Sequence, residues 1–230
     1  MTTDSAALYR LMSWLSPSFP VGAFSYSHGI EYAVEAGLVR DEQSLRGWIE
    51  AGLNQEFGPV TGAMLRNAHE ATTTRDRKGL ADALEEARAF VPTTEFELEH
   101  RAQGQAFILC LQAAWSETRD STWLNAILNG DWVPYPCAVG IAAAAASVPL
   151  EAALNAFFHG VVSNLVSAGI RLIPLGQTSG QRILAHLQAA VLTAANDVLK
   201  RDPADIGAAA PLVEWTSTAH ETQYTRLFRS

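Results

Sequence analysis

Residues 15–31 read Leu-Ser-Pro-Ser-Phe-Pro-Val-Gly-Ala-Phe-Ser-Tyr-Ser-His-Gly-Ile-Glu, and the rest of the chain is organised around this stretch. Pro17 and Pro20 fix φ and lack a backbone donor, so no helix can run through them. Gly22 permits backbone angles that are closed to other residues. A loop this apolar is costly on a free surface, so we expect it to pack against its own fold or against a partner. The simpler alternative is a rigid connection between two helices.

Apolar residues at helical spacing, with prolines and glycines between them, predict helices on both sides of this loop. The first helix ends before Pro17, and the second is expected from about Ser25 to Ala36. Asp41 caps the third, and Gly58-Pro59 is expected to end it, so that Pro59 opens the fourth. Further helices are expected over residues 59–69, 80–90, 94–115, 120–129, 137–146, 149–174 and 178–202.

The predicted fold is all-α, because no four residues alternate apolar and polar between turn signals. We expect a single domain over residues 1–230, a helical bundle of about nine or ten helices. Residues 137–146 are nearly all Ala and Gly, which favours a central helix that its neighbours approach closely. Residues 1–24 form an N-terminal helix and a Pro-rich loop. Residues 204–230 are weakly patterned, so little ties residues 216–230 to the core and they can form a mobile docking segment.

The net charge, the number of cysteines and the distribution of apolar residues exclude several classes of protein. A net charge of −8 argues against a nucleic-acid binder, which needs a basic stripe. Two cysteines, Cys110 and Cys137, make no disulfide framework and fit a reducing cytoplasm. The N-terminus does not have the pattern of a secretory signal. The apolar run over residues 134–150 is Ala-rich and too short for a membrane span, so we expect a buried helix there.

No catalytic or metal centre is predicted from the spacing of ligand-type residues. The six histidines are far apart, and no pair has metal-site spacing. Cys137 is expected to be a buried apolar cysteine. Glu95, Glu97 and Glu99 alternate around a helix beside His100, so a solvated face is expected there rather than a site. The alternative from another functional class is a stand-alone helical enzyme that uses His28, Glu31 and His220.

Three separated blocks, in order along nearly the full chain, resemble one known family. They are residues 17–31, the pair Ser163-Asn164 with Arg171-Leu-Ile-Pro-Leu-Gly-Gln-Thr-Ser-Gly-Gln181, and His220-Glu-Thr-Gln-Tyr-Thr-Arg-Leu-Phe228. Together they are similar to the urease accessory protein F (UreF) family. The chain departs from the pattern at His28, where the family usually has Gln, at Ala23, often Gly, and at Gln103, commonly Met. The role of position 28 is therefore open.

The resemblance implies an all-α homodimer in the cytoplasm with no catalysis of its own. UreF proteins sit between UreD (UreH in some species) and the GTPase UreG on the urease apoprotein. That assembly guides nickel to the urease active site in step with GTP hydrolysis. No cofactor is expected to be bound tightly, because the assembled complex handles the nickel. Neither nucleic acid nor a membrane is an expected partner.

The resemblance and the residue types together give the candidate sites. Interfaces favour aromatic residues and Arg, and a lone Arg171 among apolar neighbours must be paired or lie at an interface, with Gln177 near the same surface. Arg171 or Arg226 could also be donated in trans to the GTPase, or could hold it in its GTP state. The predicted structural loop residues are Pro17, Pro20, Gly22, Gly176 and Gly180. The predicted partner-binding residues are Tyr26, His28, Glu31, Arg171, Gln177, His220, Glu221, Tyr224, Arg226 and Phe228.

Overall fold

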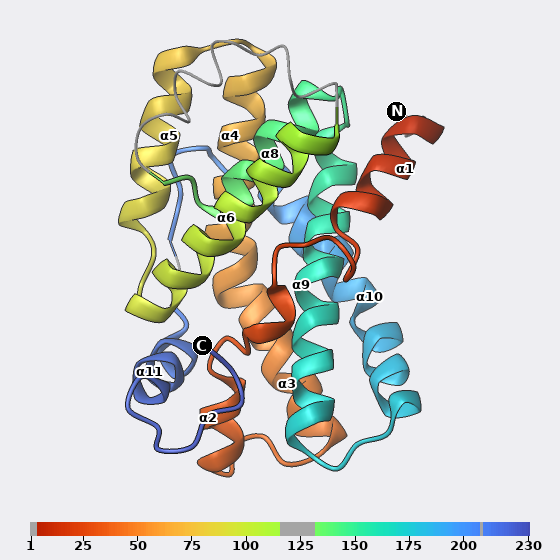
Figure 1. Ribbon diagram of the computed structural model, residues 1–230, viewed down its shortest axis with the longest axis vertical. Coiled ribbons are helices and arrows are strands. Elements are labelled where there is room, and N and C mark those ends of the chain that lie inside the picture. Colours follow the sequence, from red (N-terminus) through yellow and green to blue (C-terminus); the bar gives the residue numbers. More distant parts are fainter. Residues whose placement is uncertain (1–3, 116–131, 208) are drawn as a thin grey trace.

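The computed structural model describes residues 4–115, 132–207 and 209–230, and every regular element in them is helical (Figure 1). The predicted all-α bundle is therefore confirmed for this part of the chain. The helix expected over residues 120–129 lies outside the described residues. The elements are α1 (Ser5–Trp14), the 3-10 helix η1 (Ala23–Ser25), α2 (Ile30–Glu35), α3 (Glu42–Gly52), the π-helix η2 (Leu53–Gly62), α4 (Ala63–Thr73), α5 (Arg77–Ala89), α6 (Thr94–Ala114), α8 (Tyr135–Ala145), α9 (Leu150–Leu172), α10 (Gln177–Lys200) and α11 (Pro211–His220).

Helix α9 runs through the middle of the bundle and contacts α2, α3, α4, α8, α10 and η2 (Figure 1). Its apolar residues occur on most of its sides, and Leu154, Phe158 and Leu165 are almost fully buried. By length and composition it is apolar enough to cross a membrane, and half of its most apolar window is buried in the bundle. Such burial is typical of a core helix.

Helices α4 and α8 pack closely because α8 presents small residues, as the sequence predicts. A side-chain carbon built on Gly140 would lie 2.3 Å from the Leu65 carbonyl oxygen. Cys137 is fully buried in the same helix, its Sγ lies 3.6 Å from the Met64 carbonyl oxygen, and burial raises the pKa of its thiol. The expected buried, apolar cysteine is therefore found.

Helices α3 and α4 form one continuous rod through η2, so the prediction that Gly58-Pro59 ends a helix is wrong. In an α-helix a proline ring collides with the carbonyl four residues earlier. The wider turn of a π-helix relieves that collision, because its hydrogen bonds span five residues. Gly58 belongs to the same adjustment, since a side-chain carbon there would lie 2.7 Å from the Leu53 carbonyl oxygen.

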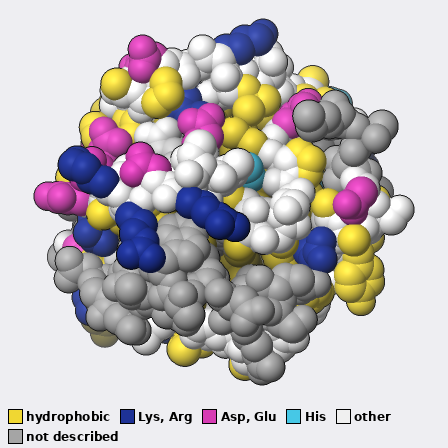
Figure 2. Space-filling view, turned by 90° about the horizontal axis from the view of Figure 1, so that it is seen from above, with side chains coloured by type: hydrophobic (Ala, Val, Ile, Leu, Met, Phe, Trp, Pro, Cys, Tyr) yellow, Lys and Arg dark blue, Asp and Glu magenta, His cyan; other side chains and the backbone are white. Residues whose placement is uncertain are grey.

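The surface seen from above carries acidic and basic side chains close together, with apolar side chains between them (Figure 2). Among the described residues on this face, charged side chains of both signs are mixed, so they do not form a patch of one sign.

Candidate partner-docking site

The loop over residues 15–29 packs against its own fold, which is the first of the two arrangements expected for it. Phe19 and Val21 are buried in the main core, and Tyr26 is 2% exposed. Pro17 and Pro20 are exposed and flank the buried Phe19. Phe24 is 67% exposed, so the loop presents an aromatic ring to solvent.

Two consecutive left-handed residues turn the loop into α2, with φ of 52° at His28 and 75° at Gly29. For this reason the helix expected from Ser25 begins only at Ile30. A side-chain carbon on Gly29 would lie 2.5 Å from Thr216 Oγ1, so the absence of one lets α11 pack against the turn.

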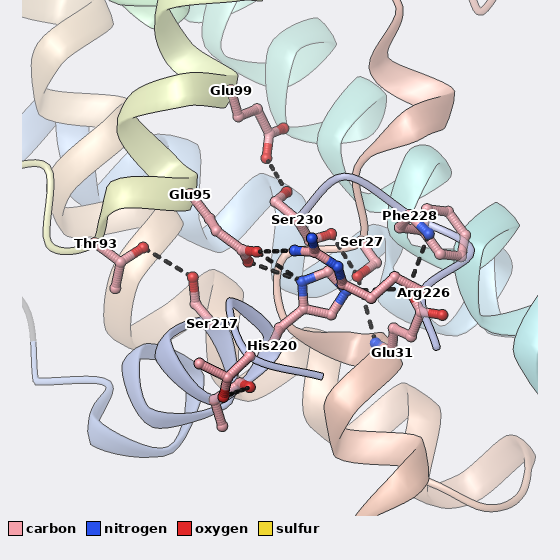
Figure 3. A network of polar contacts seen from close by, with 12 residues as sticks. Ser27, Glu31, Thr93, Glu95, Glu99, Ser217, His220, Arg226, Phe228 and Ser230 are labelled. Atoms are coloured by element: carbon pink, nitrogen blue, oxygen red, sulfur yellow. Dashed lines mark hydrogen bonds and ion pairs between the residues drawn. The ribbon is translucent and has the colours of Figure 1, made fainter. Parts of the chain in front are cut away.

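His220 joins three helices inside the molecule (Figure 3). Its side chain is completely buried, and its Nε2 lies 3.0 Å from Glu31 Oε2 of α2. Its Nδ1 lies 2.8 Å from Glu95 Oε1 of α6. Both ring nitrogens therefore face carboxylates, an arrangement that requires a protonated imidazole. Here we call Glu31, Glu95, Glu99, His28 and His220 the carboxylate–imidazole network.

The C-terminal segment, residues 221–230, is tied to the same network. Glu31 accepts hydrogen bonds from the backbone N–H of Leu227 at 2.6 Å and of Phe228 at 2.9 Å. The Ser230 carbonyl accepts from both the N–H and the hydroxyl of Ser27 at 2.6 and 2.7 Å. The expectation that little ties residues 216–230 to the core is therefore wrong. Sequence reasoning missed these ties because most of them are made by backbone atoms.

The expectation that Glu95 and Glu99 lie on a solvated face of their helix is also wrong. They are 5% and 4% exposed and lie one helical turn apart on the buried side of α6. Glu99 accepts from His28 Nε2 at 2.8 Å, from Gln103 at 2.7 Å and from the Ser230 hydroxyl at 3.1 Å. The spacing of four residues was the available signal, whereas the partners come from distant parts of the sequence.

Burial and pairing act in opposite directions on the pKa values of this network. Burial alone would lower the pKa of His220, but hydrogen bonds to Glu95 and Glu31 outweigh it and raise the pKa. The pKa of His28 is raised in the same way, with Glu99 as the main partner. For Glu99 burial would raise the pKa, and the His28 charge and hydrogen bond hold it below its usual value. The His28–Glu99 pair is thus an ion pair.

Arg171 lies over the C-terminal segment and is both exposed and paired. Its guanidinium carbon lies 4.4 Å from the centre of the Phe228 ring, and its Nη2 donates to the Phe24 carbonyl at 2.8 Å. Phe24, Arg171 and Phe228 thus lie together. Gln177, at the first turn of α10, is exposed, and none of these contacts involves it.

The other predicted partner-binding residues divide into buried and exposed ones. Glu31, His220 and Phe228 are buried, so their side chains are not open to a partner in this conformation. Tyr224 is fully exposed, Glu221 is exposed, and Arg226 lies 3.5 Å from Glu95 with a side chain 42% exposed. Because α11 ends at His220, Tyr224 and Phe228 do not share the helical face expected for them. Gly176 precedes α10, and Gly180 packs against Val166.

The alternative hypothesis of an enzyme that uses His28, Glu31 and His220 requires a solvent-accessible site, and these residues do not form one. Glu31 and His220 are in contact, but both nitrogens of His220 face carboxylates and no part of its side chain reaches solvent. His28 pairs with Glu99 instead of joining them. Among the described residues no group of three or more His, Cys, Asp or Glu side chains is arranged to hold a metal ion.

The fold and site define a class of protein, a helical bundle whose loop and C-terminal segment are locked together and present aromatic and arginine side chains. The UreF family model matches residues 39–188. The chain is 49% identical over 227 residues to the urease accessory protein UreF of Rhodopseudomonas palustris strain BisB5, covering 99% of this chain and 93% of that protein. The chain is 50% identical to the UreF protein of R. palustris strain HaA2, covering 99% of this chain and 95% of that protein. It is 49% identical to the UreF protein of Bradyrhizobium sp. strain ORS 278, covering 99% of this chain and 93% of that protein. The chain belongs to the UreF family. This is a family of accessory proteins rather than enzymes, in agreement with the sequence prediction.

Proposed function

We propose that the chain bridges UreD (UreH) and the GTPase UreG on the urease apoprotein and couples GTP hydrolysis to nickel insertion. It acts as a cytoplasmic homodimer. The nickel passes through the assembled complex and is not held tightly by this chain. The membership of the family supports the accessory role, and the surface formed by the loop and the C-terminal segment supports the bridging role.

The observation that carries the proposal is the exposed group Tyr224, Arg226 and Leu227 in the C-terminal segment, which is joined to the loop next to Phe24 by the bond from the Arg229 N–H to the Ser25 carbonyl at 2.8 Å. Phe24, Tyr224 and Leu227 are 67%, 103% and 65% exposed. Isolated monomers seldom keep several large apolar side chains exposed near one another, and such patches are typical of interaction sites. Buried contacts hold the backbone below them, so a partner would meet a preformed surface and little ordering entropy would be lost on docking.

The arginines of this surface offer a second kind of contact. Arg171 and Arg226 are exposed at one side of a molecule whose net charge is −8, and Arg229 is also exposed. They suit an acidic group on a partner or the phosphates of GTP. Arg171 or Arg226 can be donated in trans to UreG, where its charge stabilises phosphoryl transfer. The same contact can instead hold UreG in its GTP state. A GTP hydrolysis assay of UreG with Arg226→Ala separates the two, since the rate falls in the first case and rises in the second.

The test is capture of UreD and UreG by this chain, with and without GTP, using a variant that carries Tyr224→Ala and Leu227→Ala. In the described part of the chain neither side chain makes a hydrogen bond, and both are exposed, so the circular dichroism spectrum and stability should stay those of the parent. We expect capture of at least one partner to fall about tenfold or more. Leu192→Ala on α10 is the matched control, because Leu192 is a 50% exposed leucine on another helix. Equal capture by the parent, the double variant and the control would contradict the proposal.

A further inference from the structure

A cavity lies between the loop over residues 15–24 and the helices α6, α8 and α9. Its volume is about 200 Å³, larger than the engineered cavity of about 150 Å³ that binds benzene in another protein. Most of its wall is apolar and includes Phe19, Val21, Phe57, Phe157 and Val161. The exposed side chains of Pro17, Phe24 and His159 are also part of the lining and mark its opening to solvent.

Three residues place polar groups on the wall, and one of these groups is buried without a hydrogen-bond partner among the residues that the structure describes. His28 Nδ1 is buried and unpartnered, while Nε2 of the same ring is bonded to Glu99. His100 (8% exposed) and the half-buried Tyr135 also line the cavity, so their ring nitrogens and hydroxyl are polar groups available at the same wall. A buried polar group without a hydrogen bond destabilises a fold, so the free His28 Nδ1 beside two further polar groups indicates that a molecule in the cavity can bond to it.

The lining residues carry no net charge, so the cavity favours an uncharged ligand. His28 and Glu99 form an ion pair, so together they add no net charge, and the nearby Glu56, whose pKa burial raises to about 7, does not line the cavity. Burial lowers the pKa of His100 to about 4 and raises that of Tyr135, so both are neutral at neutral pH. A charged ligand would leave water without gaining a counter-ion. His28 Nδ1, as the second nitrogen of a protonated ring, is a hydrogen-bond donor and needs an acceptor.

We propose that this cavity binds a small uncharged organic molecule that has an apolar body and a carbonyl or hydroxyl group. The oxygen accepts from His28 Nδ1 and bonds to His100 or Tyr135, and the body packs against the aromatic wall. The cavity adjoins the docking surface at Phe24, whereas Tyr224, Arg226 and Leu227 do not line it. The proposal adds a small ligand to a protein otherwise expected to bind only other proteins.

The experiment uses the full chain and a series of benzene derivatives of similar size, followed by protein NMR and by calorimetry. Benzamide and benzyl alcohol are the uncharged probes, and benzoate and benzylammonium are the charged ones. We expect saturable shifts at Val21 and Val161 with the uncharged probes, and affinities at least tenfold weaker for the charged ones. If no uncharged probe binds below millimolar concentration, or if the charged probes bind equally well, the proposal is overturned.

Tyr135→Phe gives a sharper test, because it removes only the hydroxyl and keeps the ring that packs against Phe107 and Phe157. The variant should be at least as stable as the parent, since that hydroxyl has no partner in the described chain. We expect benzamide to bind about three- to tenfold more weakly to this variant or to His100→Phe. Toluene, which cannot hydrogen-bond, should bind parent and variant equally. Unchanged benzamide affinity in both variants would show that these polar groups do not recognise the ligand.

Discussion

His220 is the residue on which the docking surface depends most directly, because it separates two buried carboxylates. In His220→Ala, Glu31 and Glu95 would face each other across a cavity without the imidazolium that bonds to both, although Arg226 stays 3.5 Å from Glu95. Removing one partner of a buried ion pair destabilises proteins by about 3–5 kcal/mol, and we expect a loss of that size in urea denaturation. His186→Ala is the control, because His186 is exposed and its hydrogen bond in the described structure is to the Arg182 carbonyl of the same helix. Equal midpoints for the two variants would contradict the role given to His220.

The stability of the fold should depend on pH through His28, since the pKa of this residue is raised above the ordinary value of 6.5 despite burial. A group whose pKa is higher in the folded chain stabilises the fold in its protonated form. That contribution is full below about pH 6.5 and is lost as the pH rises through the folded pKa. His28→Gln cannot be protonated, so its stability should depend less on pH than that of the parent between about pH 6 and pH 9. Stability measured at both ends of this window tests it, and identical slopes would count against an ionised His28.

At the scale of elements, the π-helix η2 predicts opposite effects for two glycine substitutions in one continuous rod. In Gly58→Ala the new methyl would lie 2.7 Å from the Leu53 carbonyl oxygen, which we expect to destabilise the fold by about 1–3 kcal/mol. Gly47→Ala in α3 meets nothing within 4 Å and should stabilise the fold by about 0.5–1 kcal/mol. Thermal unfolding distinguishes them. A stable Gly58→Ala variant would mean that the π turns relax easily to α.

The C-terminal segment is the element in which a deletion and a point substitution should give different results. A chain that lacks residues 221–230 loses the donors to Glu31 and the hydroxyl that contacts Glu99. We expect it to lose stability by more than about 2 kcal/mol, whereas Tyr224→Ala should remain within about 0.5 kcal/mol of the parent. Denaturation of both variants checks this. Equal stability of the truncated and full chains would mean that the contacts of the segment are marginal.

The helices were predictable where local chemistry determines them. Asp41 caps α3 as expected, with its side chain accepting from the Ser44 N–H at 2.8 Å. The break at Pro59 was wrong because a π turn depends on packing around Gly58 and not on a local signal. The network was missed for a related reason. Glu95, Glu31 and His220 are widely separated in the chain, and no periodicity reports which distant side chains meet.

At the scale of the whole molecule, the core predicts a single cooperative transition. α9 touches elements from both halves of the chain, and one apolar cluster extends from Ala7 to Val198. Helix loss followed by circular dichroism and tertiary loss followed by tryptophan fluorescence should therefore coincide. Trp14, Trp48 and Trp215 report from α1, α3 and α11. Two separated transitions would contradict the prediction of a single domain.

The buried position of Ser230 has a practical consequence for protein engineering. Its side chain and carbonyl face Glu99 and Ser27, and only 1% of the residue is exposed. An affinity tag or fluorescent reporter joined after Ser230 would have to leave from an interior position, and would displace the residues that hold the segment in place. Asp4, Ser5 and Ala6 at the start of α1 are exposed, so a fusion on the amino-terminal side of α1 would leave the buried segment in place.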